Sequence, residues 1–255
     1  MPITNKLLRV LRPVVSEHVY TIRRGFGKGL KRRGGFEFVP EGLVKLTPED
    51  QFLMKLDLRG KTVYDLGAFQ GRLTICFARA VGVDGRVIAF EPNPRNHARV
   101  SENVQLNGFK NVQVLCIGVG SKKGAIRLQF DDRDTGRSSF REDYFEKRNL
   151  KANEELLVEV NSIDNLIADC ALPKPDFVKM DVEEFEFEAL TGMKETVKEY
   201  KPQLLIELHG ASKRIDRVLT LVLSYGYSIW HIELGDSVTP ATTEKVQGGQ
   251  HIYCC

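Results

Sequence analysis

Short runs of apolar, often β-branched residues alternate with longer segments in which apolar residues recur every three or four positions. Runs of the first kind are typical of buried strands, and the second spacing is typical of helices with one buried face. The predicted strands cover residues 62–66, 86–90, 112–117, 176–180 and 203–208. The predicted helices cover residues 72–81, 94–106, 184–200 and 212–224. This order predicts an α/β fold with a mostly parallel, twisted sheet and helices on both faces.

Both ends of this pattern carry further predictions. Residues 47–50 read Thr-Pro-Glu-Asp, which combines a capping hydroxyl, a first-turn proline and two first-turn carboxylates. They predict a helix that runs to about residue 56. Near the other end, residues 227–233 and 251–254 are predicted to be two more strands, paired across a polar turn region. The sheet is therefore expected to have seven strands, the last of them antiparallel.

The alternation breaks between the third and fourth strands of the sheet. Residues 125–130 and 156–160 resemble strands and flank the polar segment 131–153. A segment of that length is long for a bare loop, and such segments are often functional. We expect residues 45–255 to form one domain, with 131–153 as a variable insertion that shapes the substrate site.

Residues 1–44 differ in character from the rest of the chain and are predicted to form a basic arm. Residues 1–45 hold ten of the 37 Lys and Arg residues but only three of the 34 Asp and Glu residues. Apolar residues in 5–15 predict a short amphipathic helix interrupted by Pro13. Residues 23–35 alternate basic residues with glycine, which predicts flexibility. The arm either binds an anionic partner or is a solvated linker.

Composition excludes several classes of protein. Hydrophobic residues make up 42% and charged residues 28%, so the chain is neither disordered nor fibrous. The five cysteines show no C-x-x-C spacing, which argues against a disulfide scaffold or a zinc knuckle. Neither a membrane-spanning apolar run nor a signal peptide is expected. A reducing, cytoplasmic location is the expectation.

The first candidate ligand site follows the strand at 62–66. In an open α/β sheet, ligands bind at the carboxyl ends of the strands. There the chain reads Asp65-Leu-Gly67-Ala68-Phe-Gln-Gly71, which is not the G-x-G-x-x-G of a dinucleotide site. S-adenosylmethionine carries ammonium and sulfonium charges in place of a pyrophosphate, and a carboxylate beside a glycine turn suits it better. The alternative is an ordinary tight turn between a strand and a helix.

The ends of the next two strands add to this interpretation. Glu91 ends the strand at 86–90, where a carboxylate can accept both hydroxyls of a ribose diol. Pro92 and Asn93 form the turn that follows and are predicted to lie beside the cofactor. Gly118, after the third strand, is small enough for an adenine ring to lie against the backbone. The alternative for Glu91 is a carboxylate that caps the following helix.

Four titratable residues follow the fourth and fifth strands. Asp181, Glu183, Glu207 and His209 are expected to converge on the same edge of the sheet. His209 is the candidate general base by residue type, since an ordinary histidine pKa is about 6.5. It alternatively only shapes the edge through hydrogen bonds. Asp181 and Glu183 are alternative bases or metal ligands, but no larger oxygen cluster supports a metal site, and none is predicted.

Taken together, these motifs resemble the FkbM family of S-adenosylmethionine-dependent methyltransferases over about residues 45–235. The resemblance implies a Rossmann-like class I methyltransferase fold and O-methylation of a hydroxyl on a sugar, a glycan or a small natural product. It implies that Asp65, Gly67 and Glu91 hold the cofactor and that Asp181 and Glu183 lie beside the methyl group. Glu184 stands where the family has glycine, which leaves the identity of the acceptor open.

Three alternatives remain open at this point. The basic arm suits an RNA methyltransferase that uses it as an electrostatic tether. The departure at Glu184 suits a non-catalytic protein that only binds the cofactor. The arm and its amphipathic helix also suit peripheral attachment to an anionic membrane. Against the RNA alternative, the Asn-Pro-Pro-aromatic turn typical of base-amine methylation is missing after the fourth strand.

Overall fold

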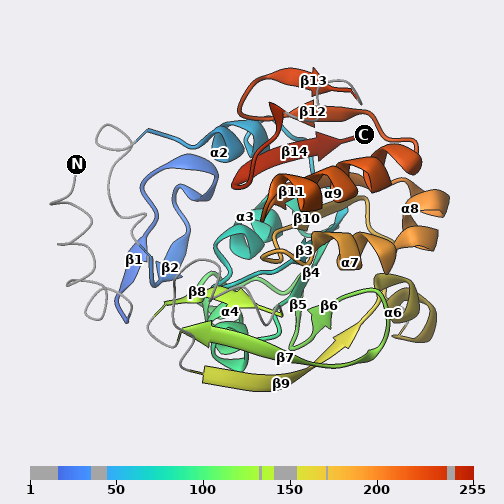
Figure 1. The fold of residues 1–255 in the computed structure, drawn as a ribbon. Coiled ribbons are helices and arrows are strands. Elements are labelled where there is room, and N and C mark those ends of the chain that lie inside the picture. Colours follow the sequence, from blue (N-terminus) through green and yellow to red (C-terminus); the bar gives the residue numbers. More distant parts are fainter. Residues whose placement is uncertain (1–16, 36–44, 132–133, 141–153, 171, 240–244) are drawn as a thin grey trace, which may run out of the picture.

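The centre of the molecule is an eight-stranded sheet (Figure 1). The computed structural model describes residues 17–35, 45–131, 134–140, 154–170, 172–239 and 245–255. From one edge to the other, the strands are β13 (Asp236–Val238), β12 (Ile229–His231), β14 (Gln250–Cys254), β11 (Gln203–Leu208), β10 (Phe177–Met180), β3 (Thr62–Leu66), β4 (Arg86–Phe90) and β5 (Val112–Leu115). The five strands predicted first are all present, each within two residues of its expected bounds.

The direction of the strands matches the prediction. Neighbours from β11 to β5 are parallel, whereas β14 runs antiparallel to both β11 and β12. The expected antiparallel last strand is therefore confirmed. The prediction of seven strands misses β13, which pairs with β12 at the edge of the sheet. Its three residues carry no alternating pattern, so nothing in the sequence distinguishes them from a turn.

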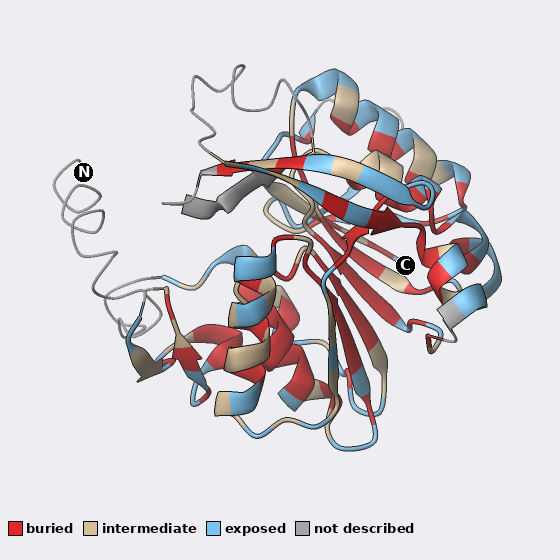
Figure 2. Cartoon of the chain, turned by 90° about the horizontal axis from the view of Figure 1, so that it is seen from below, coloured by how far each residue is buried: buried red, intermediate tan, exposed pale blue. Residues whose placement is uncertain are grey.

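Helices cover both faces of the sheet because alternate strand residues point to opposite sides. On β4, Val87 and Ala89 pack into one hydrophobic cluster, whereas Ile88 and Phe90 pack into the other. The first cluster is covered by α2 (Pro48–Leu53), α3 (Arg72–Val81) and α4 (Pro94–Leu106). The second is covered by α6 (Ile163–Cys170), α7 (Glu186–Thr191), α8 (Lys194–Tyr200) and α9 (Ser212–Ser224). Figure 2 shows the buried strands between the two helical layers.

The single helix predicted over residues 184–200 is two helices, α7 and α8. They meet at Gly192, where an added Cβ would lie 1.9 Å from the backbone oxygen of Gly120. The chain just after β6 (Gly118–Val119) therefore packs directly against the backbone of Gly192. Only glycine at position 192 leaves room for this contact. Apolar periodicity continues through the break and does not reveal it.

The insertion between the third and fourth strands of the sheet is itself a small sheet. Its order is β6, β9 (Glu154–Asn161), β7 (Gly124–Asp131) and β8 (Asp134–Ser139). The strands expected near 125–130 and 156–160 are confirmed as β7 and β9. Of the predicted substrate segment 131–153, residues 132–133 and 141–153 lie outside the described residues.

The prediction that residues 23–35 are flexible is wrong, because the structure places them in a folded hairpin. A hairpin of β1 (Val19–Thr21) and β2 (Lys31–Arg33), joined through the short helix η1 (Gly25–Gly27), packs on α3 and α4. Its buried apolar side chains are Ile22, Phe26 and Leu30, which join the hydrophobic cluster under α3. On α4, Asn107 and Asn103 accept hydrogen bonds from the backbone nitrogens of Lys31 and Arg33, at 2.8 and 2.7 Å. The helix predicted at 5–15 lies outside the described residues.

None of the helices in the described ranges combines the length and the apolar character needed to cross a bilayer.

Candidate active site

A cavity of about 190 Å³ opens at the carboxyl ends of β3, β4 and β10, under the small sheet of the insertion. It is lined by Gly67, Phe69, Phe90, Glu91, Pro92, Asn96, Ile117, Gly118, Val119, Leu128, Ser139, Phe140, Asp181, Val182 and Glu183. Of the residues predicted to bind a cofactor, five line it: Gly67, Glu91, Pro92, Gly118 and Asp181. Asp65, Ala68, Gly71 and Asn93 do not line the cavity.

The glycine turn after β3 brings two loops into direct backbone contact. Gly67 has a φ of +79°, and an added Cβ would lie 1.8 Å from the backbone oxygen of Asp181. The backbone nitrogens of Gly67 and Ala68 both donate to the carbonyl of Phe90, at 3.0 Å. Gly71 precedes α3 and lies against Val100 of α4. Ala68 and Gly71 therefore shape the turn from behind rather than facing the cavity.

Asp65 lies behind this turn and has no exposed surface. Its Oδ2 accepts a hydrogen bond from the hydroxyl of Thr74 at 2.6 Å, and its Oδ1 lies 3.9 Å from Nζ of Lys179. Burial raises the pKa of this carboxyl. The predicted direct contact between Asp65 and the cofactor's ammonium group does not fit this geometry, because Lys179 already occupies the space beside it. Asp65 instead supports the turn through α3.

Glu91 lines the cavity and is almost fully buried, with 5% of its surface exposed. Its two oxygens accept hydrogen bonds from the backbone nitrogens of Phe69 at 2.8 Å and Asn93 at 2.9 Å. Burial raises the pKa of Glu91 to about 7, although these hydrogen bonds lower it. The helix cap of α4 is Asn93, which accepts from the Arg95 nitrogen at 3.0 Å. The capping interpretation of Glu91 is thus wrong, and Asn93 is the cap rather than a cavity residue.

The opposite wall of the cavity comes partly from the insertion. An added Cβ on Gly118 would lie 2.6 Å from the ring of Phe140, so glycine lets this ring pack against the backbone. Phe140 also packs on Phe185, with ring centroids 4.9 Å apart. Leu128, Ser139 and Phe140 are site residues that the sequence reasoning missed. They lie in the segment between the recognisable motifs, where only the unusual length of the insertion indicated a role.

Asp181 and Glu183 line the cavity near the carboxyl end of β10. Glu183 and Glu184 both have positive φ, 47° and 72°, which turns the backbone sharply after the strand. The backbone oxygen of Glu183 accepts a hydrogen bond from Ser139 of the insertion at 3.0 Å. The carboxylates of Asp181 and Glu183 therefore lie where the small sheet meets the central sheet.

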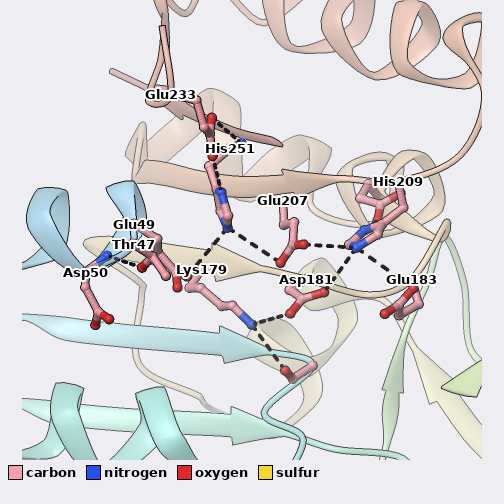
Figure 3. A network of polar contacts seen from close by, with 12 residues as sticks. Thr47, Glu49, Asp50, Lys179, Asp181, Glu183, Glu207, His209, Glu233 and His251 are labelled. Atoms are coloured by element: carbon pink, nitrogen blue, oxygen red, sulfur yellow. Dashed lines mark hydrogen bonds and ion pairs between the residues drawn. The ribbon is translucent and has the colours of Figure 1, made fainter. Parts of the chain in front are cut away.

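His209 lies next to this pair, as predicted, but it does not line the cavity (Figure 3). Its Nδ1 is 2.8 Å from the buried carboxylate of Glu186. Its Nε2 is 3.4 Å from Glu207, 3.8 Å from Asp181 and 3.9 Å from Glu183. Burial acts to lower the pKa of His209, but Glu186 and Glu207 outweigh it and raise the pKa to about 11. This shift argues against His209 as a general base in the free protein and favours its alternative role of shaping the edge through hydrogen bonds.

Charged residues continue the cluster in both directions (Figure 3). On one side, Nζ of Lys179 is 3.2 Å from Oδ2 of Asp181 and donates to the backbone oxygen of Gly67 at 3.3 Å. On the other, Nε2 of His251 is 3.5 Å from Oε2 of Glu207. Nδ1 of His251 is 2.6 Å from Glu233. Acidic and basic groups thus alternate along the edge of the sheet from β14 to β3.

This arrangement fits S-adenosylmethionine. The buried Glu91 can accept hydroxyls of a ribose, and the apolar lining residues Ile117, Leu128 and Phe140 can contact a flat ring. The strand order, with an antiparallel strand beside β11, is that of the Rossmann-like class I methyltransferase fold.

The particular family follows from comparison with known proteins. The family model described as methyltransferase FkbM domain matches residues 65–229, more than half of the chain. The chain therefore belongs to the FkbM methyltransferases, and S-adenosylmethionine is its cofactor.

Individual relatives agree with this assignment. The hexuronic acid methyltransferase AglP of Haloferax volcanii is 28% identical over 58% of this chain and 56% of its own length. A crystal structure of methyltransferase FkbM from Methylobacillus flagellatus has a TM-score of 0.55 at 19% identity. That similarity covers 82% of this chain and 50% of the other, and it concerns the fold. The chain thus spans only about half the length of each of these relatives.

Proposed function

We propose that this methyltransferase transfers the methyl group to a hydroxyl of a sugar, a glycan or a small natural product. The observation that carries the proposal is the pair Asp181 and Glu183, two carboxylates that line the same cavity as Glu91. Carboxylates accept hydrogen bonds from hydroxyls and can take up the proton that an alcohol loses on methylation. The name of the Haloferax relative, a hexuronic acid methyltransferase, supports a sugar acceptor.

The cofactor is proposed to lie along the cavity with its ribose at one end. Glu91 would accept the ribose hydroxyls, and the adenine ring would lie among the apolar lining residues Ile117, Leu128 and Phe140. The amino-acid end would then reach the turn at Gly67 and the backbone beside Asp181. When bound, S-adenosylmethionine supplies an electrophilic methyl on a sulfonium. This placement leaves Asp181 and Glu183 as the charged groups nearest to the reacting end.

On the acceptor side, the protein's contribution would be alignment and proton removal. Holding an oxygen in line with the methyl–sulfur bond can supply several kcal/mol without any covalent step. Asp181 and Glu183 are suited to orient the hydroxyl and to receive its proton. Since neighbouring carboxylates raise the pKa of His209, it would act by holding Asp181 and Glu183 in place. Its electrostatic attraction to both is consistent with separations of 3.8 and 3.9 Å.

The test is an acceptor screen with isotope-labelled S-adenosylmethionine. The full chain is incubated with sugar nucleotides, oligosaccharides and polyhydroxylated natural products, and labelled products are assigned by mass spectrometry and NMR. The proposal expects a new O-methyl group on one class of these compounds, and loss of its formation in Glu183→Gln. Label found on a base nitrogen of RNA, with none on hydroxyl acceptors, would overturn it.

A further inference from the structure

The cluster around His209 also has the geometry of a cation site. One oxygen of Asp181, one oxygen of Glu207 and one ring nitrogen of His209 all lie within 4.8 Å of one another. These three residues come from the ends of two adjacent parallel strands, β10 and β11. We infer that Asp181, Glu207 and His209 bind a divalent cation of the magnesium or manganese type.

The first argument is the position of Nε2 of His209. This side chain is 8% exposed, and its Nε2 faces three carboxylates at 3.4 to 3.9 Å. Ordinary N–H···O hydrogen bonds are about 2.7–3.2 Å long, so the 3.4 Å contact of Nε2 with Glu207 is long for one, and its contacts with Asp181 and Glu183 are longer still. Two ligands of one metal ion, each about 2.1 Å from it, lie about 3.0–3.4 Å apart. The observed spacing fits donors around a common centre after small shifts.

The second argument is the group on the other side of the ring. Metal-binding histidines usually donate their second N–H to a carboxylate, which fixes the ring and the tautomer. Here Nδ1 of His209 is 2.8 Å from Oε1 of Glu186, a side chain with 1% exposure. Among the described atoms, Oε2 of Glu186 has no hydrogen-bond partner. Oε1 of Glu186 also accepts from the backbone nitrogen of Glu184 at 3.1 Å, and its contact with Nδ1 leaves Nε2 facing Asp181 and Glu207.

The third argument is that each carboxylate is held by its outer oxygen. Oδ2 of Asp181 pairs with Lys179 at 3.2 Å, and Oε2 of Glu207 pairs with His251 at 3.5 Å. The inner oxygens, Oδ1 and Oε1, are the ones that face His209. Ligating carboxylates are usually supported in this way by a second layer of hydrogen bonds. One oxygen of each residue is therefore left for a cation.

The donor set selects the type of ion. Carboxylate oxygens suit magnesium, calcium and manganese, whereas an imidazole suits first-row transition ions; manganese is a transition ion that carboxylates also suit, so it is the probe for this mixed set. Since Asp181 belongs to both the cluster and the cavity, a cation here would lie beside the acceptor hydroxyl and could polarise it. Only this use of the ion rests on the proposed function, because binding itself stands on the geometry of the cluster.

The test is a Mn²⁺ titration of the chelator-treated full chain, followed by electron paramagnetic resonance of the free ion. It is run at pH 7.0 and 8.5, because the ion must displace the second proton of His209, whose pKa is about 11 in the free protein, so that affinity should rise with pH. One bound Mn²⁺ per chain is expected, with affinity reduced at least tenfold in Asp181→Asn and Glu207→Gln. Competition by Mg²⁺ is expected as well. The matched control is Glu102→Gln on α4, a carboxylate of comparable exposure that lies outside the ligand set and the residues supporting it, and it is expected to bind within threefold of the parent.

Thermal unfolding and cofactor binding are measured on the same samples, so that a misfolded variant is not mistaken for a lost ligand. No Mn²⁺ binding by the parent chain, or equal binding in Asp181→Asn, Glu207→Gln and the parent, would overturn the inference. Methyl transfer to a hydroxyl that persists in chelator would leave the proposed function intact while removing the cation from it. Mn²⁺ binding without methylation of any hydroxyl acceptor would support the cation site and count against the proposed function.

Discussion

The backbone of Gly67 lies directly against the carbonyl oxygen of Asp181, so that a Cβ on Gly67 would sit 1.8 Å from that oxygen. This contact joins the turn after β3 to the loop after β10. The first loop forms the cofactor end of the cavity, and the second carries the carboxylates of the proposed acceptor side. The distance between the two ends of the site is therefore set by a position that only glycine can occupy.

Gly67→Ala is expected to separate these loops. The change adds both a steric overlap with Asp181 and the cost of a positive φ, so we expect at least about 3 kcal/mol of lost stability together with lost cofactor binding. The matched control is Gly60→Ala, which has a φ of +71° but no neighbouring atom within 4 Å. Its expected cost is only about 1 kcal/mol. Chemical denaturation and calorimetry with S-adenosylhomocysteine measure both effects, and equal costs at the two positions would contradict the account.

Cofactor affinity is expected to depend on pH through Glu91. In the free protein the pKa of this carboxyl is about 7 because of burial, and only the ionised form can accept from both ribose hydroxyls. Bound hydroxyls stabilise the charged form and lower the pKa, so affinity should increase as pH rises from 6 to 8. Glu91→Gln should bind about tenfold to a hundredfold more weakly, as expected for lost charge-assisted hydrogen bonds. Its affinity should also be flat over this range, and a parent-like pH profile in the variant would refute the assignment.

Backbone strain at Glu184 is expected to reverse the usual order of stability, in which an alanine variant is more stable than a glycine variant. Its φ of 72° suits glycine, the residue that the family has here, whereas alanine is normally the more stable choice. We therefore expect Glu184→Gly to be more stable than Glu184→Ala by about 1 kcal/mol. Both variants lose the ion pair with Arg214, so the comparison isolates the backbone. At Lys198, inside α8, the same pair of substitutions should favour alanine, and the same order at both positions would show that Glu184 is unstrained.

The ring of Phe140 is expected to close the cavity over the backbone of Gly118. Gly118→Ala would place its Cβ 2.6 Å from this ring, so the ring must move and cofactor affinity should fall about tenfold or more. Replacing the ring in Gly118→Ala/Phe140→Leu should recover part of that loss. A double-mutant cycle measured by calorimetry tests the pair, and strictly additive effects would mean that the two residues do not interact in the bound state.

The amino-terminal hairpin is expected to be part of the folded unit. Ile22 is 2% exposed and packs in the cluster under α3, so Ile22→Ala should cost about 2–4 kcal/mol of unfolding free energy. Val83, which is 94% exposed, provides the control, because Val83→Ala removes no packing. Chemical denaturation curves of the two variants measure their unfolding free energies. Equal stability of the two variants would indicate that the hairpin does not contribute to the core.

Much of the fold was predictable because its main helices and strands carry clear apolar patterns and marked ends. Residues 62–66, 72–81, 94–106, 203–208 and 212–224 have the predicted bounds in the structure. Capping residues such as Asn93 and glycines such as Gly226 mark these ends in the sequence. The hairpin near residues 19–33 was missed, since its glycines and basic residues indicate flexibility. Its burial comes from three isolated apolar side chains whose partners lie on α3.

The site was predictable only as far as its motifs extend. Gly67, Glu91, Gly118 and Asp181 were found because strand ends in a parallel sheet meet at one edge. The sequence could not show that Asp65 faces away from the cavity. Nor could it show that four carboxylates surround His209 and raise its pKa, because Glu186 arrives from a helix rather than from a strand end. Such effects depend on distances between elements, which patterns along the chain do not encode.

The central claim is that the carboxylates after β10 serve the acceptor and not the cofactor. Once an acceptor is identified, this claim is tested by single-turnover methyl transfer in the parent and in Glu183→Gln, both saturated with cofactor. The account predicts cofactor affinity within threefold of the parent and a methyl-transfer rate reduced by about 10²-fold or more, as for a lost proton acceptor. An unchanged rate in Glu183→Gln, or a loss confined to cofactor binding, would contradict it.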